Sequence, residues 1–454
     1  MIKHFFRDKS FYKAMIAIAL PITLQNLIAS SVNMLDTLMI TSLGKESLAA
    51  VGLANQIFFF YSVTMFGIST GSSIFIAQFW GKEDSKNIRR ILGLALFIGT
   101  GLGIVFTLAA LFVPENIMRI FSKDPEVIRL GVEYLKVVAF SYIITGISFS
   151  YEIASRSVGQ AKMPMIVSFI SFMTNALFNY LLIFGKFGFP QLGIRGAAYG
   201  TIIARAVEFG LIMYFIYSEH GPLAGSIKEM TDWNSAFVKK YFKTAYPVIL
   251  NEAMWSLGTV MYSIAYAKIG TVAAASVQIL STVENIFMVM VFGVANSCTV
   301  MIGNKIGAGE EEVAIEYANR YLIISIILGM TLGVALFFSS DFIIGIFGNL
   351  TPEMHSTSKK LLTVLSAVLF VKSFNASMIV GVFRGGGDTK FSMILEMSAV
   401  WLVGVPLAFL GALVFKFPVY YVTAMVYMEE VLKAIIGIPR VISKKWVTNL
   451  IENM

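Results

Sequence analysis

One carboxylic acid, Asp36, lies inside an otherwise apolar stretch, fifteen positions after Pro21. Placing such an acid at the centre of a membrane helix costs about 2.5–3.5 kcal/mol. A carboxylate kept away from water is stabilised by a bound proton or a positive ion, which is the chemistry of an ion-coupling site. The alternative interpretation is an acid that hydrogen-bonds to a neighbouring helix and only makes a bundle rigid.

Two further isolated acids, Glu252 and Glu284, lie in apolar stretches of the second half of the chain. Neither has a basic residue one helical turn away, so both could bind a cationic organic compound or a coupling cation directly. Lys372 offers the alternative, because it could pair with one of them from another helix. The glutamates are therefore candidates for substrate binding or for a second cation site.

Pro21 precedes Asp36 in the same apolar stretch. Proline removes one backbone donor and clashes with the preceding turn, so a helix should bend there or be able to bend. Many membrane helices contain a proline that does not move, and a static kink is the other interpretation.

The composition indicates that these residues lie in a membrane protein. Of the 454 residues, 57% are apolar and only 14% are charged, against about 45–50% and about 25% in soluble domains. The mean hydropathy is +0.76. So few charges cannot cover a water-soluble surface, and we expect an all-α polytopic membrane protein.

A membrane-spanning helix needs about 20 apolar residues, and twelve stretches of that kind are expected. They are residues 14–43, 48–80, 91–114, 130–157, 163–185, 193–217, 241–268, 273–305, 317–340, 358–384, 391–415 and 418–439. The first follows a basic flank of Lys3, Arg7, Lys9 and Lys13, but it is too long for a signal-peptide core, so we interpret it as the first spanning helix.

The cations predict the topology. One side of the predicted spans collects both termini and most Lys and Arg residues, and excess Lys and Arg marks the cytoplasmic side. This distribution predicts a multi-pass protein of the cell membrane with both termini in the cytoplasm, and it explains the net charge of +8 without a nucleic-acid partner. The cytoplasmic set includes Lys82, Lys86, Arg89, Arg90, Lys228, Lys239, Lys240, Lys243, Arg440, Lys444 and Lys445.

Several kinds of chemistry are excluded or disfavoured. A single cysteine, Cys298, excludes an intrachain disulfide and a thiolate metal cage. His4, His220 and His355 all lie outside the expected spans, so an intramembrane histidine metal site is not expected. No expected helix carries a clustered acid, base and nucleophile, so we predict no enzymatic activity and no resident cofactor. We also expect a monomer, although no sequence motif bears on the oligomeric state.

The two halves repeat one another. A shift of 226 positions aligns Pro21 with Pro247, Gly44 with Gly270 and Gly81 with Gly307. A shift of 228 aligns Arg156, Gly159 and Lys162 with Arg384, Gly387 and Lys390. We therefore expect two six-helix bundles in a parallel tandem repeat, residues 1–217 and 241–454, joined by a cytoplasmic linker, 218–240. Such a repeat is the plan of some secondary transporters. The alternative interpretation is that the duplication only builds a large bundle and has no part in transport.

The chain resembles the multidrug and toxic compound extrusion (MATE) family of transporters over nearly its whole length. The resemblance rests on Leu20-Pro21 to Asp36-Thr37, on Gly81-Lys82-Glu83, on the turn from Arg384 to Lys390, and on Gly196-Ala197-Ala198 before Thr201. Relatives in the wider superfamily flip lipid-linked sugars, so the resemblance implies the fold more firmly than the cargo.

The resemblance also implies a site. Some family members bind sodium with the acid of the first helix, an Asn and an Asp on the fifth helix, and a Thr on the sixth; the matching positions here are Asp36, Asn175, Asn179 and Thr201. Asn179 departs from the pattern, and losing that carboxylate should weaken sodium relative to a proton. The i, i+4 amides could instead form an interhelical hydrogen-bond pair. The second-lobe sodium site of some members is not carried over, because Ser373 replaces its acid.

These observations predict a secondary antiporter that exports amphipathic, cationic small molecules in exchange for protons or sodium ions. In the family arrangement, protonation of the acid changes the bend of the first helix, which gives Pro21 the role of a hinge. The alternative is a flippase for lipid-linked oligosaccharides, for which Arg205 and Lys372 are the main anion-binding candidates.

Overall fold

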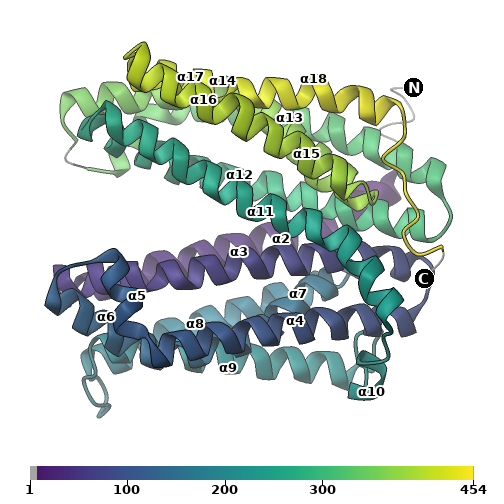
Figure 1. Cartoon of the computed structure of the whole chain (residues 1–454), viewed down its shortest axis with the longest axis horizontal. Helices are drawn as coiled ribbons and strands as arrows, with labels where there is room; N and C mark the ends of the chain where they lie inside the picture. The colour runs from purple at the N-terminus through teal and green to yellow at the C-terminus, as the bar shows by residue number, and fades with distance from the viewer. Residues whose placement is uncertain (1–7, 349, 453–454) are drawn as a thin grey trace. The chain divides into compact units, whose positions relative to one another are not determined.

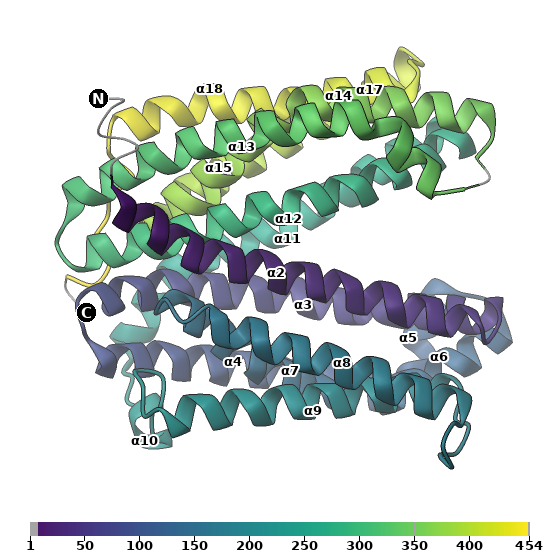
Figure 2. The same cartoon turned by 180° about the vertical axis from the view of Figure 1, so that it is seen from behind.

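The computed structural model describes residues 8–348 and 350–452, and within these ranges it contains helices and no strand. Lys3, His4 and Arg7 of the predicted basic flank and histidine set lie outside the described residues. Figures 1 and 2 show the helices from opposite sides, and helices such as α8 and α9 run side by side in both views.

The first six predicted spans are all present, and short helices occupy two of their connections, α5 (Pro114–Phe121) before the fourth span and α10 (Ile227–Met230) after the sixth. The spans are α2 (Lys9–Thr41), α3 (Lys45–Gly81), α4 (Ser85–Phe112), α6 (Pro125–Val138) followed by α7 (Phe140–Ser157), α8 (Lys162–Phe184) and α9 (Ile194–Ser218).

The second six spans are longer and less regular. They are α11 (Ser235–Ile269), α12 (Thr271–Gly307), α13 (Glu311–Ile346), α14 (Pro352–Ala376) continued by η1 (Ser377–Arg384), the run α15 (Thr389–Ala399), η2 (Val400–Gly404), α16 (Val405–Phe409) and η3 (Leu410–Val414), and finally α17 (Val419–Val426) followed by α18 (Met428–Ile442).

The described part of the chain has nine helical runs long and apolar enough to cross a membrane on their own. The other three predicted spans differ for visible reasons. The α6–α7 and α17–α18 spans are interrupted at Ala139 and Tyr427, and α11 carries Asn251 and Glu252 in its apolar stretch. The fold class is therefore confirmed as twelve transmembrane segments in two six-helix bundles.

The eleventh span was expected to be a plain α-helix, but π-helical segments η2 and η3 flank Pro406. Proline has no backbone N–H and clashes with the turn before it, so the regular ladder cannot continue through this residue. A π-helical turn holds one extra residue and lets the remaining donors find acceptors farther back. The span therefore stays continuous without a sharp break.

The chain divides into two compact units, which we call the N-terminal unit and the C-terminal unit. The N-terminal unit holds Leu24–Ile76 and Asp84–Phe242. The C-terminal unit holds the described residues up to Thr23, the segment Ala77–Glu83, and the chain from Lys243 onward. The lobe boundaries drawn from the sequence, 1–217 and 241–454, stay a prediction.

Helix α2 continues through Pro21 without interruption, and the division between the two units falls inside it, directly after Thr23. Both units thus contain part of this one helix. The role of Pro21 as a hinge stays a prediction. Pro21 lies two residues before the division, so a bend at this proline would lie close to the boundary between the two parts of α2.

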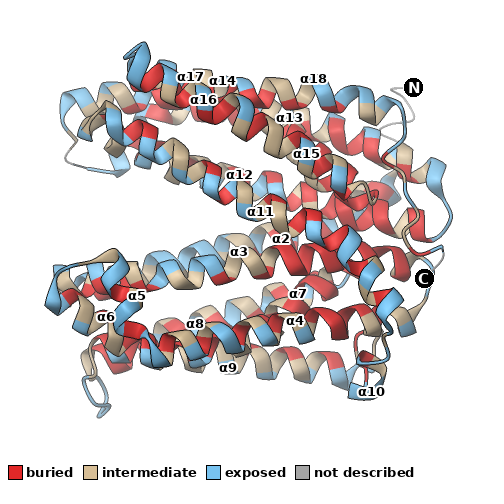
Figure 3. Ribbon diagram, in the orientation of Figure 1, coloured by how far each residue is buried: buried red, intermediate tan, exposed pale blue. Residues whose placement is uncertain are grey.

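The internal repeat is confirmed by two reciprocal close contacts inside the C-terminal unit. A Cβ atom added to Gly81 would lie 1.8 Å from the carbonyl oxygen of Asn304, and one added to Gly307 would lie 1.8 Å from that of Gln78. The shift of 226 relates Gly81 to Gly307 and also Gln78 to Asn304. The ends of α3 and α12 therefore pack backbone to backbone through a matched pair of glycines, and Figure 3 shows how buried the C-terminal half of α12 is.

We predict that Gly307→Ala destabilises the protein by about 1–3 kcal/mol, because the added methyl group meets backbone that cannot rotate away. Thermal unfolding in detergent measures this change. Gly101→Ala is the matched control, since nothing lies within 4 Å of its added Cβ. Equal melting temperatures for the two variants would contradict the packing described.

Asp8 stabilises the beginning of α2. Its Oδ1 atom accepts hydrogen bonds from the Ser10 hydroxyl at 2.5 Å and the Phe11 amide at 3.1 Å, and its Oδ2 atom lies 2.8 Å from Nη1 of Arg320 on α13. The Ser10 hydroxyl, then the Phe11 amide and the Arg320 guanidinium, lower the pKa of Asp8 from 3.8 to about 2. The ionised carboxylate therefore contributes stability that is lost on acidification.

Asp8→Ala should cost about 1 kcal/mol at neutral pH, the usual effect of losing a helix N-cap. The contribution is complete above the unfolded pKa of 3.8 and disappears as the pH falls through the folded pKa of about 2. Unfolding of the wild type and the variant should therefore differ at pH 7 and converge near pH 2. A difference that persists at the lower pH would show that the charge of Asp8 is not responsible.

Candidate functional site

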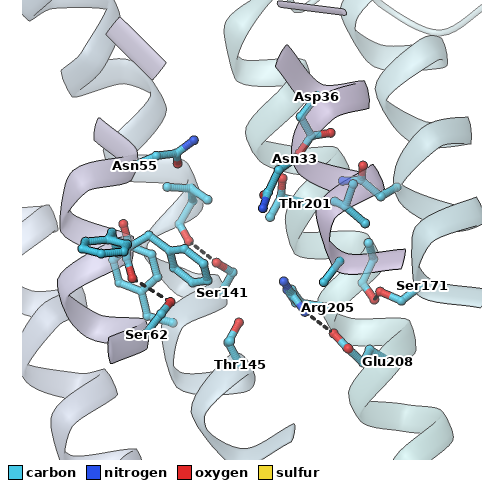
Figure 4. A pocket seen from close by; sticks show the side chains of 18 of the residues that line it. Asn33, Asp36, Asn55, Ser62, Ser141, Thr145, Ser171, Thr201, Arg205 and Glu208 are labelled. Atoms are coloured by element: carbon cyan, nitrogen blue, oxygen red, sulfur yellow. Dashed lines mark hydrogen bonds and ion pairs between the residues drawn. The ribbon is translucent and has the colours of Figure 1, made fainter. Parts of the chain in front are cut away.

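The N-terminal unit encloses a cavity of about 790 Å³. Side chains of α2, α3, α6, α7, α8 and α9 line it, and Figure 4 shows its polar residues on facing helices. This volume lies within the roughly 300–1,000 Å³ of small-molecule sites in proteins. The cavity mixes aromatic residues such as Phe58, Phe59 and Tyr142 with charged and amide side chains.

Asp36 lies at this cavity and meets the two predicted amides. Asn179 donates from Nδ2 to Asp36 Oδ1 at 2.6 Å and to Asn175 Oδ1 at 3.2 Å. Asn175 and Asn179 lie one turn apart on α8 and are buried, so both present their amides toward α2. The structure thus brings three of the four residues of the predicted coupling site into one hydrogen-bonded chain.

Thr201 lies on α9 and lines the same cavity, on the side that carries Asp36 in Figure 4. Its hydroxyl donates to the carbonyl of Ala197 at 3.0 Å, a bond within its own helix. Thr201 forms no hydrogen bond with Asp36.

Small residues on α9 allow the close approach that positions Asn179. A Cβ atom added to Gly200 would lie 2.1 Å from Asn179 Oδ1, and one added to Gly196 would lie 2.5 Å from the carbonyl of Leu182. The Asn179 Oδ1 atom is buried and has no hydrogen-bond partner. An unpartnered buried oxygen costs free energy, and this oxygen is an available acceptor beside Asp36.

Asp36 forms no salt bridge with any described residue. Arg205 is the cation whose charge acts on it, but the Arg205 guanidinium is paired with Glu208, three residues farther along the same helix, at 2.6 Å. The carboxyl group of Asp36 is therefore bound by an amide only. It is neither placed against lipid nor locked to a permanent basic partner.

A second polar group in the cavity was missed at the sequence level. Gln25 donates from Nε2 to Glu152 at 3.0 Å and to Ser168 at 2.8 Å, and its Oε1 atom accepts from Arg156 at 2.6 Å. Glu152 and Arg156 are spaced i, i+4 on α7, where a direct ion pair would be expected, and Gln25 forms hydrogen bonds with both. The available signal was its position one turn after Pro21.

Glu252 and Glu284 lie in the C-terminal unit, and each has a cation from another helix. Glu252 Oε1 lies 2.6 Å from Arg384 Nη1, and Glu284 Oε1 lies 2.5 Å from Lys372 Nζ. The pairing of Lys372 with one of these glutamates matches the alternative drawn from the sequence. Tyr427 also donates to Glu284 at 3.1 Å.

The donors around Asp36 suit a hard monovalent cation or a proton. Among the described residues there is no group of three His, Cys, Asp or Glu side chains that could hold a metal ion. A sodium ion would need oxygen ligands from Asp36, Asn175, Asn179 and Thr201. Asn179 presents its nitrogen to Asp36, so its amide would have to rotate to serve as a ligand, whereas a proton needs no such change.

The chain has clear relatives among known proteins. Residues 21–181 and 247–410 each match the protein family described as MatE. The chain is 27% identical over 398 residues to the probable multidrug resistance protein NorM of Thermotoga maritima, covering 87% of this chain and 85% of that protein. It is 26% identical over 447 residues to the uncharacterized transporter YisQ of Bacillus subtilis, covering 97% and 96%.

Among solved structures, the fold is similar to that of a MOP superfamily transporter from Pyrococcus furiosus. The TM-score is 0.85 at 19% sequence identity, with 95% of this chain and 96% of that chain covered. A likeness at this identity supports the fold alone.

Gly200→Ala should displace the Asn179 amide from Asp36, because the new methyl group would lie 2.1 Å from Asn179 Oδ1. We expect ion-driven efflux of a fluorescent dye from proteoliposomes to fall at least tenfold while the variant still folds, at a cost of about 1–3 kcal/mol. Gly210→Ala on the same helix is the control, since nothing lies within 4 Å of its added Cβ. Normal efflux by Gly200→Ala would show that Asn179 has no part in coupling.

Proposed function

The chain belongs to the MATE family of transporters, as its sequence resemblance implied, and from this premise we propose that it exports amphipathic cationic compounds in exchange for protons or sodium ions. The observation that carries the proposal is Asp36, a carboxyl group at a cavity of about 790 Å³ that is bound by an amide and by no cation. A positive ion or a cationic ligand would supply the charge it lacks.

The charges of the cavity favour a cationic substrate. Three acids, Asp36, Glu152 and Glu208, line it together with two cations, Arg156 and Arg205. An intramembrane cavity with one acid in excess attracts a positive charge and disfavours an anion. The aromatic lining adds faces on which an organic cation can bind through its apolar part and its charge.

Exchange follows from competition for Asp36. When Asp36 is ionised, Asn179 donates to a charged acceptor and the cavity holds its full negative charge. A proton on Asp36 removes that charge and weakens the Asn179 bond, so a bound organic cation loses an electrostatic partner and can leave. Proton and substrate thus occupy the site in turn, which is the requirement for antiport.

Helix α2 connects this site to the rest of the chain. Asp36 lies on its portion within the N-terminal unit, and Pro21 lies two residues before Thr23, the last residue of its portion in the C-terminal unit. We propose that a change in the hydrogen bond at Asp36 alters the bend at Pro21. The ligand would then bias the helix between two shapes through its differential affinity for them.

Protons are favoured over sodium as the coupling ion by the amide at position 179. A carboxylate there would give a sodium site a second negative ligand; the amide presents its nitrogen instead. Sodium stays the second candidate, with Asp36, Asn175, Asn179 and Thr201 as its oxygen ligands.

Glu252 and Glu284 are secondary candidates for binding substrate or a second cation. A cationic ligand would have to compete with Arg384 for Glu252 and with Lys372 for Glu284. We further propose that the protein acts as a monomer in the cell membrane, with both termini in the cytoplasm and no enzymatic activity.

Arg205 supports one alternative, a flippase for a lipid-linked oligosaccharide. Its side chain lines the cavity, is 31% exposed, and has Glu208 as its ion-pair partner. A phosphate group could displace Glu208 from the guanidinium, since Arg binds phosphate through two parallel hydrogen bonds. The acid excess of the cavity argues against this alternative.

The test is efflux from proteoliposomes. A proton gradient and a sodium gradient are imposed in separate experiments, and the wild type should export a fluorescent organic cation in at least one of them. Asp36→Asn should remain folded, but its rate of export should be at least tenfold lower. The amide keeps the shape of the side chain but cannot bind the ion through a charge. Asp341→Asn is the control, because Asp341 also lies on a spanning helix, α13, but its carboxylate is exposed and paired with Lys359.

Undiminished gradient-driven efflux by Asp36→Asn would refute the role of this carboxyl group. Transfer of a fluorescent anionic lipid between leaflets by the wild type, without gradient-driven cation efflux, would favour the flippase. In that case Arg205→Gln should abolish lipid transfer.

A further inference from the structure

Three helical segments of the C-terminal unit meet at one buried guanidinium group. Arg384, the last residue of η1, is 2% exposed. Its Nη1 atom lies 2.6 Å from Glu252 Oε1 on α11, and its Nη2 atom lies 3.5 Å from Glu396 Oε2 on α15. The sequence singles out Glu252 but not Glu396, because nothing in the spacing shows that these two acids share one cation.

This cluster has one negative charge too many. A single guanidinium can neutralise one carboxylate, and its two unequal distances show that it pairs well with Glu252 and poorly with Glu396. Lys433 on α18 also acts electrostatically on Glu396, but it is already shared by Glu429 at 3.4 Å and Glu430 at 3.3 Å. An uncompensated buried charge costs several kcal/mol, and a bound proton removes that cost.

Asn251 provides a place for that proton. It is 2% exposed, and its Nδ2 atom donates to Glu396 Oε2 at 2.5 Å, while its Oδ1 atom is buried without a partner. A side-chain amide can donate to a carboxylate or, after rotation by half a turn, accept from a carboxylic acid. The unpartnered oxygen is therefore an acceptor that rotation of the amide would offer to a protonated acid.

The internal repeat places a related arrangement, without a second acid at the position of Glu396, in the N-terminal unit. Under the shifts of 226 and 228, Asn251 corresponds to Gln25, Arg384 to Arg156 and Glu396 to Ser168. In the N-terminal unit Gln25 joins Arg156 and Ser168 through hydrogen bonds. The C-terminal unit keeps the same three-helix contact but has a carboxylate in place of the serine hydroxyl, and it adds Glu252.

We propose that the pair Glu252 and Glu396, bridged by Arg384, binds one exchangeable proton and is a second proton site of the transporter, separate from Asp36. We assign the proton to the pair because one guanidinium group lies against both carboxylates. Both carboxyl groups retain some exposure, 15% for Glu252 and 16% for Glu396. The proposal deepens the proposed antiport, to which it would add one proton for each cycle.

Difference infrared spectroscopy of the purified full-length protein tests the site without transport. Near neutral pH exposed carboxyl groups are ionised, so a carbonyl stretch of a carboxylic acid reports a retained proton. The spectra to compare are those of the wild type, Glu396→Gln, Glu252→Gln and the exposed control Glu312→Gln, whose parent side chain is 87% exposed.

We expect Glu396→Gln and Glu252→Gln each to lose the same single carboxylic-acid band, because Arg384 fully neutralises whichever acid is left. Glu312→Gln should keep that band, and Asp36→Asn should keep it too. The agreement of two different variants distinguishes a shared proton from a local disturbance of the fold.

Retention of the band in either variant, or its absence from the wild type, would overturn the proposal. Failure of the antiport proposal has a different signature, since Asp36→Asn would then transport normally whatever the infrared spectra show. If Glu396→Gln does not fold, Glu252→Gln alone decides the question through the same band.

Discussion

The structure depends on the burial of more acids than cations inside apolar helices. In the N-terminal cavity the excess falls on Asp36, which is bound by the Asn179 amide alone. In the C-terminal unit five acids, Glu252, Glu284, Glu396, Glu429 and Glu430, share three cations, Lys372, Arg384 and Lys433. Lone charges are costly in a membrane, and our proposal is that exchangeable positive ions neutralise the remaining acids.

Duplication supplied two copies of this framework, and substitution made them different. Asp36 corresponds to Tyr262 under the shift of 226, and Thr201 corresponds to Glu429 under the shift of 228. The Tyr262 hydroxyl donates to Glu429. In the N-terminal half the acid lies on the first helix and the hydroxyl on the sixth, whereas in the C-terminal half the hydroxyl lies on the first helix and the acid on the sixth. Of these two acids, only Asp36 lacks a cation in contact with it.

Much of this architecture was predictable, because it follows from periodicity and burial. The apolar stretches predicted all twelve spans, and the aligned glycines Gly81 and Gly307 predicted a repeat that the structure confirms in a reciprocal contact. The family pattern placed Asp36, Asn175 and Asn179 together, and they do form one hydrogen-bonded chain. Their function stays a proposal.

What the sequence could not show is pairing between helices. Whether Glu252 meets Arg384, or Gln25 joins Glu152 to Arg156, depends on the rotation of each helix about its axis, which apolar stretches of this kind leave undetermined. The helix interruptions at Ala139 and Tyr427 could not be predicted from the sequence either, because neither residue is a helix breaker. Such features arise from packing against neighbours, and only coordinates reveal them.

The most direct test of the central claim is the pH dependence of substrate binding at equilibrium. If a proton and an organic cation compete for Asp36, the Kd of tetraphenylphosphonium for the detergent-purified protein should rise as the pH falls, and the rise should approach tenfold per pH unit once most of the acid is protonated. Asp36→Asn should flatten this dependence. A Kd that is the same at every pH and at every sodium concentration in the wild type would contradict the account.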